Sequence, residues 1–120
     1  MTYDLAVWEG DRPVDDAAAG KLFSDLYCRY IDIDTGVDRP PTDRIAAYVA
    51  ALLQRWPDMT EDEHDISPWC SGPLIDEANG PLIYFGLRWS MAEEASAYAA
   101  ELASSMGLVC FDVSRDKLCS

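Results

Sequence analysis

Alternating apolar and polar side chains predict a strand near each end of the chain. In residues 3–8, Tyr3, Leu5 and Val7 fall on one side and the residues between them fall on the other. Residues 108–113 form another short apolar run, which we expect to be the last strand. The residues that follow are polar, and we expect them to form a tail.

Between these strands, apolar side chains recur every three or four residues in three segments, a spacing that is typical of amphipathic helices. The first segment begins at Asp15 or Asp16, whose carboxylate can cap free backbone N–H groups, and it reaches Tyr30. The second begins after Thr42 and ends at Trp56, because the following proline cannot continue a helix. The expected buried faces are Leu22, Phe23, Leu26, Tyr27 and Tyr30 in the first helix, and Ile45, Val49, Leu52, Leu53 and Trp56 in the second.

The third helical segment carries the strongest start signal. Ser90 and Glu93 have the spacing of a capping box, in which each side chain binds the other's backbone N–H. Gly107 suits the left-handed position that closes a helix. The expected buried stripe is Met91, Ala95, Tyr98, Leu102 and Met106.

Two Gly-Pro-Leu-Ile runs, at 72–75 and 80–83, predict a β-hairpin. The pair Asn79-Gly80 between them is a strong turn signal. We expect the second strand of this hairpin to continue through Leu87 or Trp89.

The expected order is β-α-α-β-β-α-β within a single α+β domain covering residues 1–120. Without the second helix, this is the β-α-β-β-α-β order of ferredoxin-like folds. We therefore expect an antiparallel sheet with the first and third helices on one face. The second helix is then an insertion beside them or against an edge of the sheet.

Charge narrows the choice of partners. The chain has 22 acidic and nine basic residues, giving a net charge of −13. This charge repels phosphate backbones and anionic lipids, and so argues against nucleic-acid and membrane binding. No apolar run approaches the roughly 18 residues of a membrane span, and no secretory signal is visible, which together indicate a cytoplasmic protein.

The sequence offers no clear metal, cofactor or catalytic site. Its four cysteines form no Cys-x-x-Cys pair, and His64 is the only histidine, which disfavours zinc. The run Asp32-x-Asp34-x-Gly36 resembles the start of a calcium loop but lacks the closing glutamate. We expect four reduced thiols, with Cys28 and Cys110 buried and inert because no base lies near them to activate a thiolate.

An acidic segment follows the second predicted helix and consists of Asp58, Glu61, Asp62, Glu63 and Asp65. Charge runs are usually solvated loops, and this is one interpretation. The second is a partner-binding patch that seats in a basic cleft, with Trp69 and Trp56 as aromatic anchors. The third is a metal or catalytic cluster.

The predicted sheet has a second candidate surface. Ile83, Phe85 and Leu87 match Tyr3, Leu5 and Val7 as the helix-facing set, which leaves Trp8, Tyr84 and Arg88 on the other face. Large apolar groups on an uncovered sheet face indicate a partner or a dimer. The alternative is that the second helix or the tail covers them.

Three stretches together resemble a known group of proteins. They are Tyr-Asp-Leu-Ala-Val-Trp-Glu-Gly at 3–10, Gly-Pro-Leu-Ile-Tyr-Phe-Gly at 80–86, and Ala-Ser-Ala-Tyr-Ala-Ala-Glu-Leu-Ala with Gly-Leu-Val-Cys-Phe-Asp within 95–112. The chain resembles a family of small acidic bacterial proteins that is frequent in actinobacteria. That family is similar to the immunity proteins that accompany polymorphic toxins. The resemblance implies a binding protein and carries no catalytic motif.

Small size, acidic charge and this resemblance favour a non-enzymatic immunity protein that neutralises a cognate toxin with a basic cleft. Acidic inhibitors reach basic clefts by electrostatically accelerated association. Two other classes stay open: a ferredoxin-like enzyme or small-molecule sensor with a pocket between sheet and helix, and a homodimeric module that uses the second sheet face.

Overall fold

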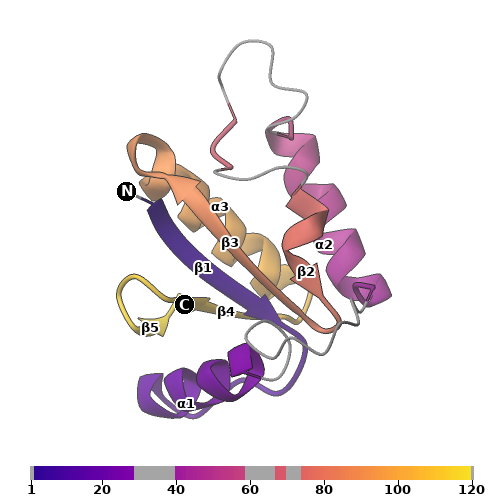
Figure 1. The fold of residues 1–120 in the computed structure, drawn as a ribbon. Coiled ribbons are helices and arrows are strands. Elements are labelled where there is room, and N and C mark those ends of the chain that lie inside the picture. Colours follow the sequence, from indigo (N-terminus) through magenta and orange to yellow (C-terminus); the bar gives the residue numbers. More distant parts are fainter. Residues whose placement is uncertain (1, 29–39, 59–66, 70–73, 120) are drawn as a thin grey trace.

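A five-stranded antiparallel sheet forms the centre of the protein, with the strand order β2-β3-β1-β4-β5 (Figure 1). The computed structural model describes residues 2–28, 40–58, 67–69 and 74–119. The strands are β1 (Thr2–Trp8), β2 (Ala78–Asn79), β3 (Leu82–Arg88), β4 (Val109–Asp112) and β5 (Lys117–Leu118). The helices are α1 (Asp16–Tyr27), α2 (Asp43–Arg55) and α3 (Ala92–Ser105), with short 3-10 turns η3 (Leu74–Glu77) and η4 (Trp89–Met91).

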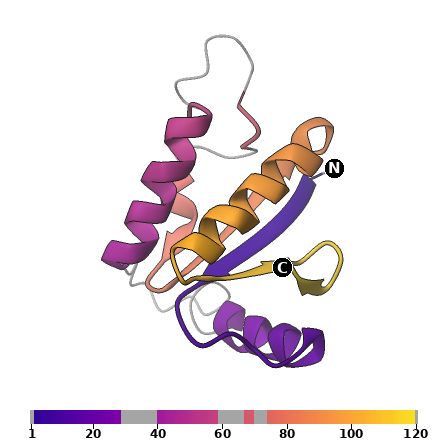
Figure 2. The same cartoon turned by 180° about the vertical axis from the view of Figure 1, so that it is seen from behind.

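One face of the sheet carries the main hydrophobic core, as the alternation predicts. Leu5 pairs with Phe85 across β1 and β3, and both side chains are buried. Helices α2 and α3 cover this face side by side (Figure 2). The side chains that join these helices to the core are Ile45, Tyr48, Val49, Leu52, Ala92, Ala95, Ala99 and Ala103. Tyr48 was missing from the predicted set; its hydroxyl donates to the Ala99 carbonyl oxygen at 2.8 Å and so ties α2 to α3.

The opposite face carries a second apolar cluster, covered by α1. Trp8 and Phe111 lie on this face because their positions alternate with those of the main core. Ala19 and Phe23 of α1 pack in this cluster. Helix α1 lies at the end of the sheet where β1 ends (Figure 1). The prediction that the first and third helices share a face is therefore wrong. The two helices that share a face are α2 and α3.

The predicted hairpin is present, with a shorter first strand. β2 and β3 are joined by Gly80 and Pro81, and Gly80 has a φ of 60°. A positive φ at the first central residue is what a type II′ hairpin turn requires, and glycine adopts it without strain. The first strand has only two residues, because Leu74–Glu77 form a 3-10 turn instead of the predicted strand.

Two predicted helix starts are confirmed. The Asp15 carboxylate accepts a hydrogen bond from the Ala18 backbone N–H at 2.8 Å. The Thr42 hydroxyl accepts one from the Ile45 N–H at 3.3 Å. Each side chain satisfies a backbone donor that the first turn of a helix leaves free.

The predicted capping box at Ser90 and Glu93 is wrong. The α-helical turns begin at Ala92, after the 3-10 turn η4, and the N-cap Met91 makes no side-chain capping bond. In η4 the Ala92 backbone N–H donates to the Trp89 carbonyl, so the chain enters α3 through a 3-10 turn.

The end of α3 matches its prediction. The N–H of Leu108 donates to the Ala103 carbonyl at 2.8 Å, and that of Gly107 donates to Ser104 at 3.2 Å. With φ at 72° for Gly107, this is a Schellman motif. Within the described part of the chain, no helix is long and apolar enough to cross a membrane.

Candidate functional site

A cavity of about 710 Å³ lies between α3 and the segment that joins β4 to β5. Its wall on α3 is made of Ala92, Glu93, Ser96, Ala97 and Ala100, and its other residues are Tyr3, Trp89, Asp112, Ser114, Arg115, Lys117, Leu118 and Cys119. Small side chains on α3 leave this space open. The volume falls in the range of small-molecule sites.

Tyr3 and Asp112 form the polar floor of the cavity. The Tyr3 hydroxyl donates to Oδ2 of Asp112, and the Arg115 backbone N–H donates to Oδ1 at 2.9 Å. Both oxygens of this buried carboxylate are thus hydrogen-bonded. Burial, together with the bond to the Asp112 carboxylate, raises the pKa of Tyr3 to about 12. Tyr3 is therefore a neutral donor near pH 7. Its hydrogen bond to Asp112 holds the start of β1 against β4.

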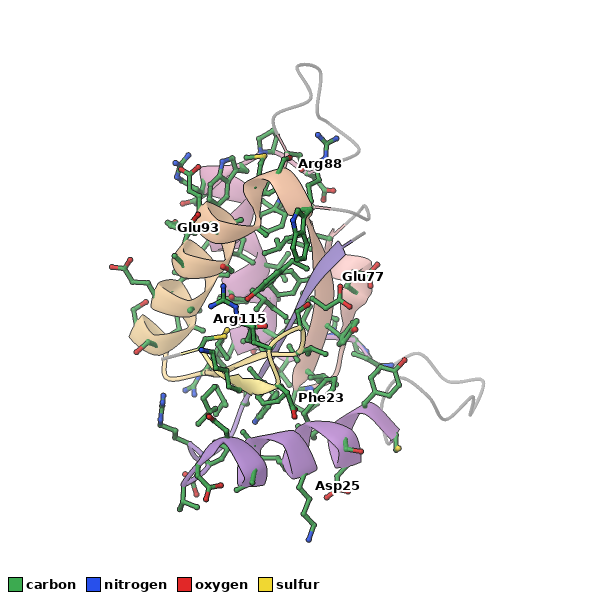
Figure 3. The ribbon with its side chains drawn as sticks, turned by 90° about the vertical axis from the view of Figure 1, so that its left-hand side faces the viewer. Phe23, Asp25, Glu77, Arg88, Glu93 and Arg115 are labelled. Atoms are coloured by element: carbon green, nitrogen blue, oxygen red, sulfur yellow. The ribbon has the colours of Figure 1, made fainter. Side chains whose placement is uncertain are left out.

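Two cations and an aromatic side chain border the cavity. Arg115 and Lys117 are exposed, and the Arg115 guanidinium lies 5.9 Å from the centre of the Tyr3 ring (Figure 3). Trp89 is 58% exposed, and its ring centre is 5.8 Å from that of Tyr3. This combination suits a ligand with one anionic group and one flat apolar part.

In and beside the acidic segment, the described residues Asp58 and Ser67 are buried. Asp58 is buried, and its Oδ2 accepts the Leu74 backbone N–H at 3.1 Å. Glu61, Asp62, Glu63 and Asp65 lie outside the described residues. Asp58 therefore acts as an internal hydrogen-bond acceptor. This differs from the prediction, in which it was a solvated or partner-facing carboxylate.

Trp69 is not a surface anchor, which corrects the prediction. Its side chain is completely buried, with edge-on ring contacts to Trp56 at 5.9 Å and to Phe85 at 6.0 Å. Its backbone forms a bridge with Leu87 of β3. Trp56 is also buried, under the Arg55 guanidinium at 4.3 Å. The two tryptophans that were candidate partner anchors are instead part of the hydrophobic core.

Trp8, Tyr84 and Arg88 do not form the open surface that was expected on the second sheet face. Trp8 is 1% exposed beneath α1, and Phe23 stacks on Tyr84 with ring centres 5.8 Å apart. The Tyr84 hydroxyl donates to Asp4 at 2.8 Å, and burial together with this bond raises the pKa of Tyr84. Arg88 is half-buried at the far end of β3 from Phe23, so the structure does not bring it together with the other two (Figure 3).

The cysteines differ from one another. Cys110 is buried, as expected, whereas Cys28 is exposed at the end of α1, which corrects the prediction that it is buried. Cys70 lies outside the described residues. Within the described ranges, no group of three or more His, Cys, Asp or Glu side chains is placed to hold a metal ion.

Sequence reasoning missed the cavity because it missed β5. Residues 114–119 look like a polar tail, yet Lys117 and Leu118 pair with Asp112 and Phe111. The only signal was weak: Leu118 and Cys119 are apolar residues that follow a short polar run typical of a turn. Asp116, with a φ of 56°, makes the left-handed bend of that turn.

Comparison with protein-family models, with curated proteins and with solved structures finds no match to this chain. A functional proposal therefore rests on the charge and the geometry of this chain's own residues.

Proposed function

We propose that this chain is a non-enzymatic binding protein that recognises a basic protein surface, and specifically an immunity protein that neutralises a bacterial toxin. The observation that carries the proposal is the excess of carboxylates. If each of the nine basic side chains neutralised one of the 22 acids, 13 carboxylates would be left over. An excess of this size creates a negative field that accelerates encounter with a basic partner.

The described acids support this proposal by their placement. Asp25, Asp43 and Glu101 are exposed on three different helices, so the negative field surrounds the fold. Figure 3 shows the Asp25 side chain pointing away from the sheet. Like charges on a surface repel one another and oppose compaction of the fold, although Asp43, in the first turn of α2, interacts favourably with the helix dipole. Recognition of a positively charged partner would account for this excess of exposed acids.

The acidic segment is the part of this surface that we assign to the partner. Beyond the buried Asp58, four acids, Glu61, Asp62, Glu63 and Asp65, fall within five residues, the densest negative run in the chain. Asp58 and Trp69, on either side of residues 59–66, are buried and held by the Leu74 N–H and by Phe85. Fixed flanks lower the conformational entropy that a binding segment loses when it docks.

For the fold, we propose a variant of the ferredoxin-like pattern in which α2 takes the place of the first helix. In support, α2 and α3 cover the same face, and β1 lies between β3 and β4. Helix α1 is then the added element, on the other face.

Growth of bacteria tests the immunity proposal. An immunity gene lies beside the gene of its toxin, so the protein encoded by the adjacent gene is the toxin to use. Cells that express this toxin alone should stop growing, and co-expression of the present chain should restore growth. Purified toxin and chain should also form a stoichiometric complex. If growth is not restored and no complex forms, the proposal is wrong.

The cavity supports a second candidate, a sensor of small aromatic carboxylates. Arg115 and Lys117 provide positive charge beside Trp89 in an otherwise acidic protein. Calorimetric titration with indole-3-carboxylate should show binding that Arg115→Gln weakens about tenfold or more, since a charged hydrogen bond contributes about 1.5–3 kcal/mol. The neutral amide of the same ligand is the control. Equal binding of acid and amide would remove this candidate.

A further inference from the structure

Two cysteines from neighbouring strands meet beside the cavity. The Sγ atoms of Cys110 and Cys119 are 2.7 Å apart, closer than two non-bonded sulfur atoms ordinarily approach. The Cys119 backbone N–H donates to the Cys110 carbonyl at 3.0 Å, which continues the pairing of β4 with β5 by one residue. The two thiols therefore face each other across an antiparallel pair.

Backbone geometry at this position is compatible with a disulfide. Phe111 pairs with Leu118, so the next pair in register is Cys110 with Cys119. Directly paired residues of antiparallel strands have Cα atoms about 4.5–5.5 Å apart, within the range of about 4.4–6.8 Å that disulfides span. Little movement of the backbone is needed to close the bond.

The two thiols differ in exposure, and the difference sets the order of reaction. Cys110 is 7% exposed, whereas Cys119 is half-buried and lines the cavity. Contact with the Cys119 thiol and burial raise the pKa of Cys110. An oxidant from solution therefore meets Cys119 first, and Cys110 is placed to resolve the product.

We propose that Cys110 and Cys119 form a reversible disulfide site, oxidised by a low-molecular-weight disulfide of the glutathione class. The Cys119 thiolate attacks one sulfur of the small disulfide, forms a mixed disulfide and releases one thiolate. Cys110 then attacks the Cys119 sulfur, forms the internal bond and releases the second small thiol, which takes up the Cys110 proton. Two protein thiols are oxidised, and one external disulfide is reduced to two thiols.

This site has a structural consequence because β5 is a two-residue strand at the edge of the sheet. The Leu118 N–H donates to Oδ1 of Asp16 at 3.0 Å, so β5 connects the sheet with the first turn of α1. Leu118 and Cys119 also line the cavity. A disulfide from Cys110 would fix the end of this strand to β4, and with it one wall of the cavity.

Trypsin makes the bond directly readable in the full-length protein. Cleavage after Arg88, Arg115 and Lys117 puts Cys110 in the peptide 89–115 and Cys119 in the peptide 118–120, while Cys28 and Cys70 fall in two other peptides. The reduced protein is incubated with oxidised glutathione, free thiols are alkylated, and the digest is analysed by mass spectrometry. The expected product is peptide 89–115 joined to 118–120, and dithiothreitol should abolish it.

Thermal unfolding gives a second readout. The oxidised protein should melt about 5–10 °C above the reduced protein, because the bond closes a loop in the unfolded chain. Cys119→Ser should melt at the same temperature with and without oxidant. Cys28→Ser, which changes an exposed thiol of α1, should keep both the linked peptide and the shift.

Two results would overturn the proposal. One is full alkylation of Cys110 and Cys119 after exposure to oxidised glutathione. The other is a linked product that joins either cysteine to Cys28 or Cys70 in place of its cross-strand neighbour. Peptide mapping of the wild-type chain detects either result without relying on the folding of any variant.

Discussion

The two faces of the sheet are covered by different means. The face under α2 and α3 is built from apolar side chains at alternate positions of β1 and β3, with alanines of α3 packed against them. The face under α1 carries a smaller cluster, in which the rings of Trp8, Phe23 and Phe111 are in mutual contact among aliphatic side chains. Alternation along a strand thus shows which side chains are buried together, but it does not show which helix buries them.

This comparison also bears on function. Because the protein's own helices cover the large apolar side chains on both faces, Trp8 and Trp69 are not available to a partner in this structure. In the described part of the chain, the surfaces accessible to a partner include exposed acids such as Asp25 and Glu101 and the cavity beside β5.

The largest effect on this comparison should come from the α2/α3 face. Phe85→Ala removes a ring that is 1% exposed and contacts Trp69. We expect it to lower the free energy of unfolding by about 3–5 kcal/mol, because the cavity it leaves cannot fully collapse. Urea unfolding measures this. A loss below that of the α1-face variant described next would contradict the assignment of the main core.

The same substitution on the α1 face should cost less. Phe23 is half-buried, although its ring lies 5.6 Å from that of Phe111 and 5.8 Å from that of Tyr84. We expect Phe23→Ala to lower the free energy of unfolding by about 1–2 kcal/mol and to expose Trp8. A red shift of tryptophan fluorescence reports that exposure. Fluorescence and stability that both stay unchanged would mean that α1 does not cover this face.

A smaller difference in the free energy of unfolding should separate the predicted helix starts at Thr42 and Ser90. Thr42→Ala removes an observed cap and should cost about 0.5–2 kcal/mol. Ser90→Ala should stay within about 0.5 kcal/mol, because Ser90 is exposed and α3 begins without a side-chain cap. Paired urea unfolding curves compare the two variants. A greater loss for Ser90→Ala would restore the capping box.

A further effect appears only at alkaline pH. The pKa of Tyr3 is raised to about 12 in the folded chain, whereas that of an unfolded tyrosine is near 10. The neutral hydroxyl therefore contributes stability that is complete below pH 10 and is lost as pH rises toward 12. Tyr3→Phe should show a flatter decline between pH 10 and 12 than the wild type in urea unfolding. Parallel declines would place Tyr3 in an ordinary solvated environment.

Local signals explain most of what the sequence predicted correctly. Asp15, Thr42 and Gly107 act within a few residues of their own positions, so their roles are readable without the rest of the fold. Alternation within each strand likewise predicted that Leu5 and Phe85 share the helix-facing side of the sheet, which the core confirms. The placement of α1 and the pairing of β5 depend on contacts distant along the chain, such as Leu118 with Asp16. No local pattern carries that information, and the cavity that depends on β5 was missed with it.

Association kinetics with the adjacent-gene toxin test the central claim most directly, that the acidic segment recognises a basic partner. The variant Glu61→Gln, Asp62→Asn, Glu63→Gln is compared with a control that removes the same charge elsewhere, Asp11→Asn, Asp25→Asn, Glu101→Gln, at exposed positions. We expect the first variant to associate about tenfold or more slowly at low ionic strength, and the control to slow less. The difference should shrink in about 1 M salt, where the Debye length is about 3 Å. Equal association rates for both variants and the wild type would contradict the claim.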